Sequence, residues 1–120
     1  MKYMILMFGD QAGMMEARSL EWIREMIGFM KNMNADLVAN GELVRAEGLT
    51  DASQAITVRF QDGAPVPTDG PYAESKESLA GYWIVDVESE ARAIEIASRV
   101  VTFIECPLEV RQIADRPPDV

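Results

Sequence analysis

Apolar residues follow a strand-like pattern in five segments of the chain. Segments 3–8 and 79–87 are apolar at odd and even positions alike, which is typical of central strands covered on both faces. In segment 55–60 apolar residues alternate with polar ones, so we expect a strand with one buried face. Segments 42–49 and 108–113 complete the set of predicted strands.

Apolar residues recur every three or four positions in two other segments, and this spacing predicts two helices. The first extends from Met14 to Leu37, with an apolar face wide enough for packing between two layers or for contact with another subunit. Asn34 and Asn40-Gly41 indicate where this helix ends. Ser89 is a suitable N-cap for the second helix. The stripe expected to be buried there consists of Ala91, Ile94, Ala97 or Ser98, and Val101.

A hairpin is expected after strand 55–60. Asp62-Gly63 favours the positive φ angles of a tight turn, and Val66 then begins a short return strand. Pro65 and Pro67 restrict that strand to an edge, because proline has no N–H for a sheet ladder.

This order of elements predicts an α+β fold of the ferredoxin-like sandwich type, in which two strand–helix–strand units are separated by the inserted hairpin. Both helices are expected on one face of the sheet. The other face of 3–8 and 79–87 is too apolar to stay in water, so we expect a second copy to cover it and form a homodimer. One domain spans 1–120, with a loose tail over 114–120.

Composition narrows the possible functions. The chain of 120 residues has a net charge of -9 and no histidine. The lack of histidine removes the commonest general base and metal ligand, and no acidic calcium loop is present, so neither a metal nor a cofactor is expected. The acidic charge and the scattered basic residues argue against nucleic acid as a partner.

The expected location is the cytoplasm. No apolar run approaches the roughly 20 residues that cross a bilayer, so no membrane partner is expected. The apolar start ends at Gly9-Asp10 without a cleavage pattern, which favours a strand over a signal peptide. Cys106 is the sole cysteine, excludes a disulfide framework, and is expected to be a small buried hydrophobe among Phe103, Ile104 and Leu108.

Thr68-Asp69-Gly70-Pro71 is a tight turn on local grounds, since Asp can bond its own backbone, Gly tolerates positive φ, and Pro has a fixed φ. Glu74, Lys76 and Glu77 then place alternating charges before the strand at 79–87. This segment is either a turn followed by a solvated helical turn with a local ion pair, or a binding loop.

The sequence resembles the DGPF branch of the YCII-related family. The matching segments, in chain order, are "YMILMFGD", "AEGL", "VRFQDGAPVPTDGPYAESKESLAGYWIVDV" and "LEVRQI", with Tyr72 where the family has Phe. The resemblance implies a ferredoxin-like dimeric α/β-barrel, similar to muconolactone-isomerase-like enzymes, with one branch acting as a chloromuconolactone dehalogenase. YCII-type members have a proposed His–Asp active site. Asp69 would supply its acidic half, and this chain has no residue for the histidine.

The first functional hypothesis is an isomerase or lyase that moves a proton on a small molecule. Asp69 would be the base, Arg59 or Arg111 would hold the developing anion, and Glu74 and Lys76 would lie at the rim.

These roles depend on which side chains of the two strands point toward the helices and which point away from them. If Ile56, Val58, Leu108 and Val110 face the helices, the polar positions of strands 55–60 and 108–113 face a cavity between the two copies. Those polar residues are Thr57, Arg59, Glu109 and Arg111. Alternatively, Arg59 pairs with Glu109 and only stabilises the sheet. Tyr72 either packs or places its hydroxyl in the cavity.

The second hypothesis is a non-catalytic protein that binds a small anionic or apolar metabolite in a methionine-rich cavity. The methionines concerned are Met4, Met7, Met26 and Met33, which could equally belong to the core. The third is a regulatory or protein-interaction module, favoured by the acidic charge and by the transcription-related label on DGPF-branch proteins.

Overall fold

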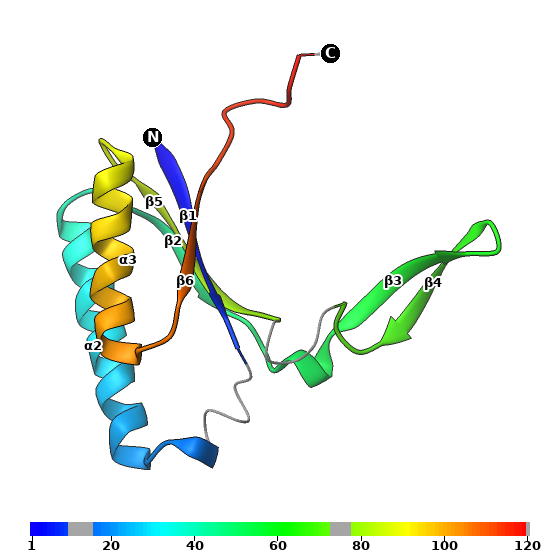
Figure 1. Ribbon diagram of the computed structural model, residues 1–120, viewed down its shortest axis with the longest axis horizontal. Coiled ribbons are helices and arrows are strands. Elements are labelled where there is room, and N and C mark those ends of the chain that lie inside the picture. The colour runs from blue at the N-terminus through cyan, green and yellow to red at the C-terminus, as the bar shows by residue number, and fades with distance from the viewer. Residues whose placement is uncertain (10–15, 73–77, 120) are drawn as a thin grey trace.

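The computed structural model describes residues 1–9, 16–72 and 78–119, in which a four-stranded antiparallel sheet carries helices α2 and α3 on one face (Figure 1). The strand order is β2-β5-β1-β6. The strands are β1 (Lys2–Phe8), β2 (Leu43–Gly48), β5 (Leu79–Asp86) and β6 (Leu108–Gln112). This order interleaves two strand–helix–strand units, so the predicted α+β fold of ferredoxin-like type is confirmed for the single chain.

The register of the two central strands decides which side chains enter the core. Tyr3 and Ile5 of β1 lie opposite Val85 and Trp83 of β5, and all four are almost completely buried under the helices. The Trp83 indole Nε1 donates a hydrogen bond of 2.9 Å to Oδ1 of Asn34 on α2. Asn34 therefore lies inside the helix and holds it to the sheet, and the prediction that it marks the helix end is wrong.

Helix α2 (Leu20–Ala39) begins later and ends later than the apolar pattern predicts. The hydroxyl of Ser19 accepts a hydrogen bond of 3.0 Å from the Trp22 N–H, which is the bond expected of an N-cap. Met14 lies outside the described residues. At the other end, the N–H of Asn40 bonds to the Asp36 carbonyl, so this asparagine closes the helix as predicted.

Helix α3 (Glu90–Ile104) has the predicted N-cap, because the Ser89 hydroxyl accepts from the Arg92 N–H at 3.2 Å. Of its predicted buried stripe only Ala97 is buried, whereas Ile94 is half exposed and Ala91 is exposed. The buried residues are Ala93, Ile96, Ala97, Val100 and Ile104. Both sets have helical spacing, so the period alone could not decide which face meets the sheet.

Strands β3 (Ile56–Gln61) and β4 (Ala64–Asp69) form a separate two-stranded sheet. Asp62 and Gly63 both have positive φ, at 51° and 77°, which confirms the predicted tight turn. The return strand is longer than expected. A two-stranded sheet leaves each strand one free edge, so Pro65 and Pro67 do not stop it.

The hairpin projects from the end of the main sheet on the side away from the helices (Figure 1). Ile56 and Val58 are each 66% exposed, so the prediction that they face the helices is wrong. The radius of gyration is 16.6 Å, compared with about 14 Å for a compact chain of this length. The chain alone is therefore open in shape, with an arm that contacts little else.

Cys106 is exposed, and its predicted burial is wrong. It follows Glu105, which ends α3 in a left-handed conformation with φ of 55°. The chain leaves the core at this cap, so the thiol lies in the connection to β6 rather than among the apolar side chains on either side.

Candidate functional site

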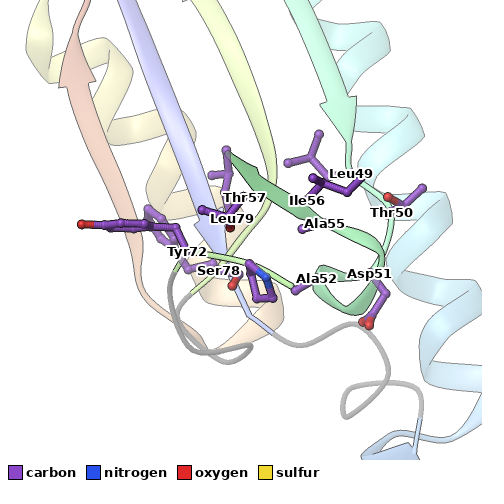
Figure 2. Close-up of a pocket in the computed structure, with 12 residues that line it drawn as sticks. Leu49, Thr50, Asp51, Ala52, Ala55, Ile56, Thr57, Tyr72, Ser78 and Leu79 are labelled. Carbon is purple, nitrogen blue, oxygen red and sulfur yellow. The ribbon is translucent and has the colours of Figure 1, made fainter. Parts of the chain in front are cut away.

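A groove of about 610 Å³ lies at the root of the hairpin (Figure 2). Three parts of the chain meet there: the end of β1, the connection from β2 with the start of β3, and the turn after β4 with the start of β5. Backbone hydrogen bonds hold these stretches together. The Gly9 N–H donates to the Ser78 carbonyl at 3.0 Å, and the Leu49 N–H donates to the Ala80 carbonyl at 2.9 Å.

Apolar side chains make up one part of the lining, namely Phe8, Leu49, Ile56, Pro71 and Leu79. Phe8, the last residue of β1, and Leu49, the residue after β2, are 40% and 39% exposed although both adjoin the main sheet. Apolar surface of this kind gains free energy when a ligand or a partner removes it from water.

Hydroxyl groups and one carboxylate make up the polar part of the described lining: Thr50, Asp51, Thr57, Tyr72 and Ser78. The Thr57 hydroxyl donates a hydrogen bond of 2.7 Å to the Gly70 carbonyl, and the Gly70 N–H donates to the Ala55 carbonyl at 2.8 Å. These two bonds join the start of β3 to the Asp-Gly-Pro turn. Gly70 has a φ of +106°, a conformation that L side chains rarely adopt.

Asp51 is the carboxylate of this lining and was not proposed for the site from the sequence. Its Oδ2 accepts from the Ser53 N–H at 3.1 Å and from the Ser53 hydroxyl at 2.7 Å. These bonds cap the short 3-10 helix η1 (Ala52–Gln54) and orient the carboxylate. In Figure 2, Asp51 and Tyr72 lie at opposite ends of the groove lining. The local pattern signals a turn, and only the folded chain brings Asp51 beside β1 and β5.

The site residues predicted from the sequence divide into two groups. Thr57 and Tyr72 line the groove, although Tyr72 is 87% exposed and its ring projects away from the other labelled side chains (Figure 2). Asp69, the last residue of β4, is exposed and does not line the groove. Glu74 and Lys76, like Glu77, lie outside the described residues.

The two predicted arginines lie in different sheets of the chain. Arg59 is exposed on β3 opposite Val66, and Arg111 is exposed on β6, where its Nη2 lies 3.0 Å from Oε2 of Glu109. The alternative pairing of Arg59 with Glu109 within one chain is therefore wrong, because β3 does not pair with β6.

Most of the methionines proposed for a cavity belong to the core. Met33 is fully buried, and Met7 and Met26 pack against the same cluster under the helices. Met4 is half-buried, and it alternates with Tyr3 and Ile5, so it lies on the face of the sheet without helices.

The strongest charged contact of the described chain lies away from the groove. Arg92 on α3 donates from Nε and Nη2 to the two carboxylate oxygens of Glu42, each at 2.8 Å, and from Nη1 to Oε1 of Glu95 at 2.6 Å. The hydrogen bonds from Arg92 lower the pKa of the Glu42 carboxyl, and those from Glu42 raise the pKa of Arg92. This fork joins α3 to the chain just before β2, and no sequence pattern pointed to it.

The described residues contain no group of three or more His, Cys, Asp or Glu side chains that could hold a metal ion. No helix within the same residues is both long and apolar enough to cross a membrane.

Comparison with known proteins places the chain in a family. It is 29% identical over 97 residues to an uncharacterized protein of Rhizobium meliloti (strain 1021). The aligned segment covers 81% of this chain and 77% of that protein. The family model described as the YCII-related domain matches residues 1–116. This match spans every described strand and helix and confirms the resemblance seen in the sequence: the chain belongs to the YCII-related family.

Proposed function

We propose that this protein is a homodimer that binds a small molecule in the groove at the root of the hairpin. The observation that carries the proposal is the convergence of three separate parts of the chain on one groove with apolar walls and hydroxyl groups. Its volume of about 610 Å³ lies within the range of small-molecule sites, which bind through apolar contact and orient the ligand with a few polar groups.

The lining favours a largely apolar ligand with a hydrogen-bond donor. The described lining residues include one carboxylate, Asp51, and no Lys or Arg. A ligand hydroxyl or amine could donate to that carboxylate, whereas a ligand carboxylate would be repelled by it. The apolar metabolite expected from the sequence is thus better supported than the anionic one.

The homodimer is supported by the face of the main sheet that carries no helix. A central strip on this face is apolar and consists of Met4, Leu6, Tyr82 and Ile84. Ion pairs border the strip, Arg45 with Glu47 at 3.1 Å on β2 and Arg111 with Glu109 at 3.0 Å on β6.

Each border of the apolar strip carries a positive and a negative side chain. Such a surface can be complementary to a second copy of itself related by a two-fold axis. Two sheets facing each other in this way would form the dimeric α/β-barrel that the resemblance implies.

Ligand-observed NMR with three probes that share one apolar body tests the binding site. The probes are 2-phenylethanol, 2-phenylethylamine and phenylacetate. We expect the alcohol and the amine to bind and the carboxylate to bind more weakly. Ala52→Trp, which fills the groove, should abolish this binding, while Ala35→Trp on the exposed side of α2 should not. Equal binding to both variants would reject the groove as the site.

A carboxylate-dependent isomerase or lyase is the second candidate. The observation that favours it is that the Asp51 carboxylate belongs to the lining, where it could take a proton from a bound molecule. The role of base first proposed for Asp69 stays a prediction, and comparison of Asp51→Asn with Asp69→Asn separates the two.

A further inference from the structure

One face of the hairpin is an apolar surface that remains exposed alongside the other described parts of the chain. Ile56, Val58 and Phe60 alternate along β3 and share a face, and they are 66%, 66% and 79% exposed. On β4, Pro67 lies opposite Val58 and Pro65 lies opposite Phe60, so both prolines extend the same surface. A two-stranded hairpin is marginally stable by itself in water, and this one has no second layer.

The exposed area of the chain is larger than a folded monomer requires. The accessible surface is 8378 Å², compared with about 6,500 Å² for a monomer of this mass. The excess of about 1,900 Å² is more than the roughly 800 Å² that each partner buries in a standard interface. The exposed tail at 114–119 contributes to this excess, and a second copy that covers the sheet and the hairpin together would remove a further part of it.

The position of the hairpin fits a second copy as the occupant. The hairpin leaves the main sheet on the side without helices, so the apolar strip of the sheet and the hairpin border the same concave side (Figure 1). A molecule docked on the strip would lie beside the hairpin. In a two-fold dimer each chain offers both surfaces, so the two hairpins would be covered equally.

We propose that the β3–β4 hairpin is a dimerization arm whose apolar face packs against the second copy. This inference rests on the homodimer of the proposed function and adds a second contact region to it. Ile56 belongs both to the apolar face of the arm and to the lining of the groove. Docking of the arm would therefore also cover part of the groove.

Sedimentation equilibrium over a dilution series tests the arm with the full chain. The variant Val58→Lys/Phe60→Lys places two charges on its apolar face and should raise the dimer dissociation constant at least about 30-fold, as for loss of interface anchors. Val38→Lys/Ile94→Lys is the matched control, because these residues are similarly exposed but lie on the helix layer. The control should keep the dissociation constant of the unchanged protein.

The variant Leu6→Lys tests the homodimer independently of the arm, because Leu6 lies in the apolar strip on the main sheet and not on the hairpin. If Leu6→Lys dissociates the dimer and the hairpin variant does not, the homodimer stands and the arm is rejected. If the unchanged protein is monomeric at every concentration, both proposals are rejected.

Hydrogen exchange of the unchanged protein gives a second measurement that does not depend on the variant folding. The hairpin amides should exchange more slowly above the dissociation constant than below it. Equal exchange rates of the hairpin amides at both concentrations would reject the proposal that the hairpin is a dimerization arm.

Discussion

The Thr57 hydroxyl donates a hydrogen bond of 2.7 Å to the Gly70 carbonyl, and this contact joins the root of the hairpin to the Asp-Gly-Pro turn. Thr57 also accepts at its carbonyl, from the Thr68 hydroxyl at 2.9 Å. The two threonines thus brace the same pair of strands, but only Thr57 lines the groove. The motif that resembles the family is therefore built into the wall of the proposed site through its backbone, rather than through the Asp69 side chain.

Thr57→Val should weaken binding of 2-phenylethanol several-fold and lower the free energy of unfolding by about 1 kcal/mol, because it removes one hydrogen bond at the groove wall. Thr68→Val is the matched control: it removes a similar bond outside the groove. We expect a similar loss of stability there with unchanged affinity, measured by urea unfolding and NMR titration. An equal loss of affinity in both variants would mean that hairpin stability, and not the lining, controls binding.

Asp51→Asn should weaken binding of 2-phenylethylamine more than that of 2-phenylethanol, because it removes the negative charge but keeps the carbonyl oxygen that accepts from Ser53. Asp69→Asn should leave both affinities unchanged, since Asp69 is exposed and outside the described lining. Isothermal titration checks both. If only Asp69→Asn lowers the affinities, Asp69 and not Asp51 is the carboxylate of the site.

Asn34→Leu should lower the free energy of unfolding by about 1–3 kcal/mol, because it leaves the buried Trp83 Nε1 without its acceptor. Asn32→Leu, at an exposed position of the same helix, should change stability far less. Urea denaturation followed by tryptophan fluorescence measures both. Equal losses would show that the Trp83–Asn34 bond contributes nothing beyond helix propensity.

Glu42→Gln should destabilise the protein by about 1–2 kcal/mol at pH 7 and much less in acid. The hydrogen bonds from Arg92 hold the pKa of the Glu42 carboxyl below its ordinary value of 4.5. A lowered pKa in the folded state means that the stabilisation is complete above pH 4.5 and is lost as the pH falls through the folded value.

Unfolding at pH 7 and in acid measures the difference between Glu42→Gln and the unchanged protein. Glu95→Gln is the control, because Glu95 is 71% exposed and its pair with Arg92 is screened by water. If Glu42→Gln lowers the free energy of unfolding by the same amount at both pH values, the negative charge of Glu42 does not stabilise the protein.

The fold was largely predictable because its signals are local. Two periods in the apolar pattern located the strands of the main sheet and both helices, and Asp62-Gly63 and Ser89 marked a turn and a cap through their own backbone preferences. The site was less predictable. Of the residues predicted for a site, Thr57 and Tyr72 lie in the groove lining, and Arg59, Arg111 and Asp69 lie outside its described part. Asp51 lies in the lining and was not predicted.

The sequence by itself determined which elements form, in what order, and that one side of the sheet stays apolar. Only the tertiary structure decided which face of α3 is buried, that Ile56 and Val58 project on an arm, and that Asp51 lines the same groove as Phe8 and Ser78. The physical reason is the sequence distance over which each kind of interaction acts. Periodicity and turn preferences act over a few residues. The groove brings Phe8 together with residues more than 40 positions later in the chain, and this meeting depends on how the whole chain packs.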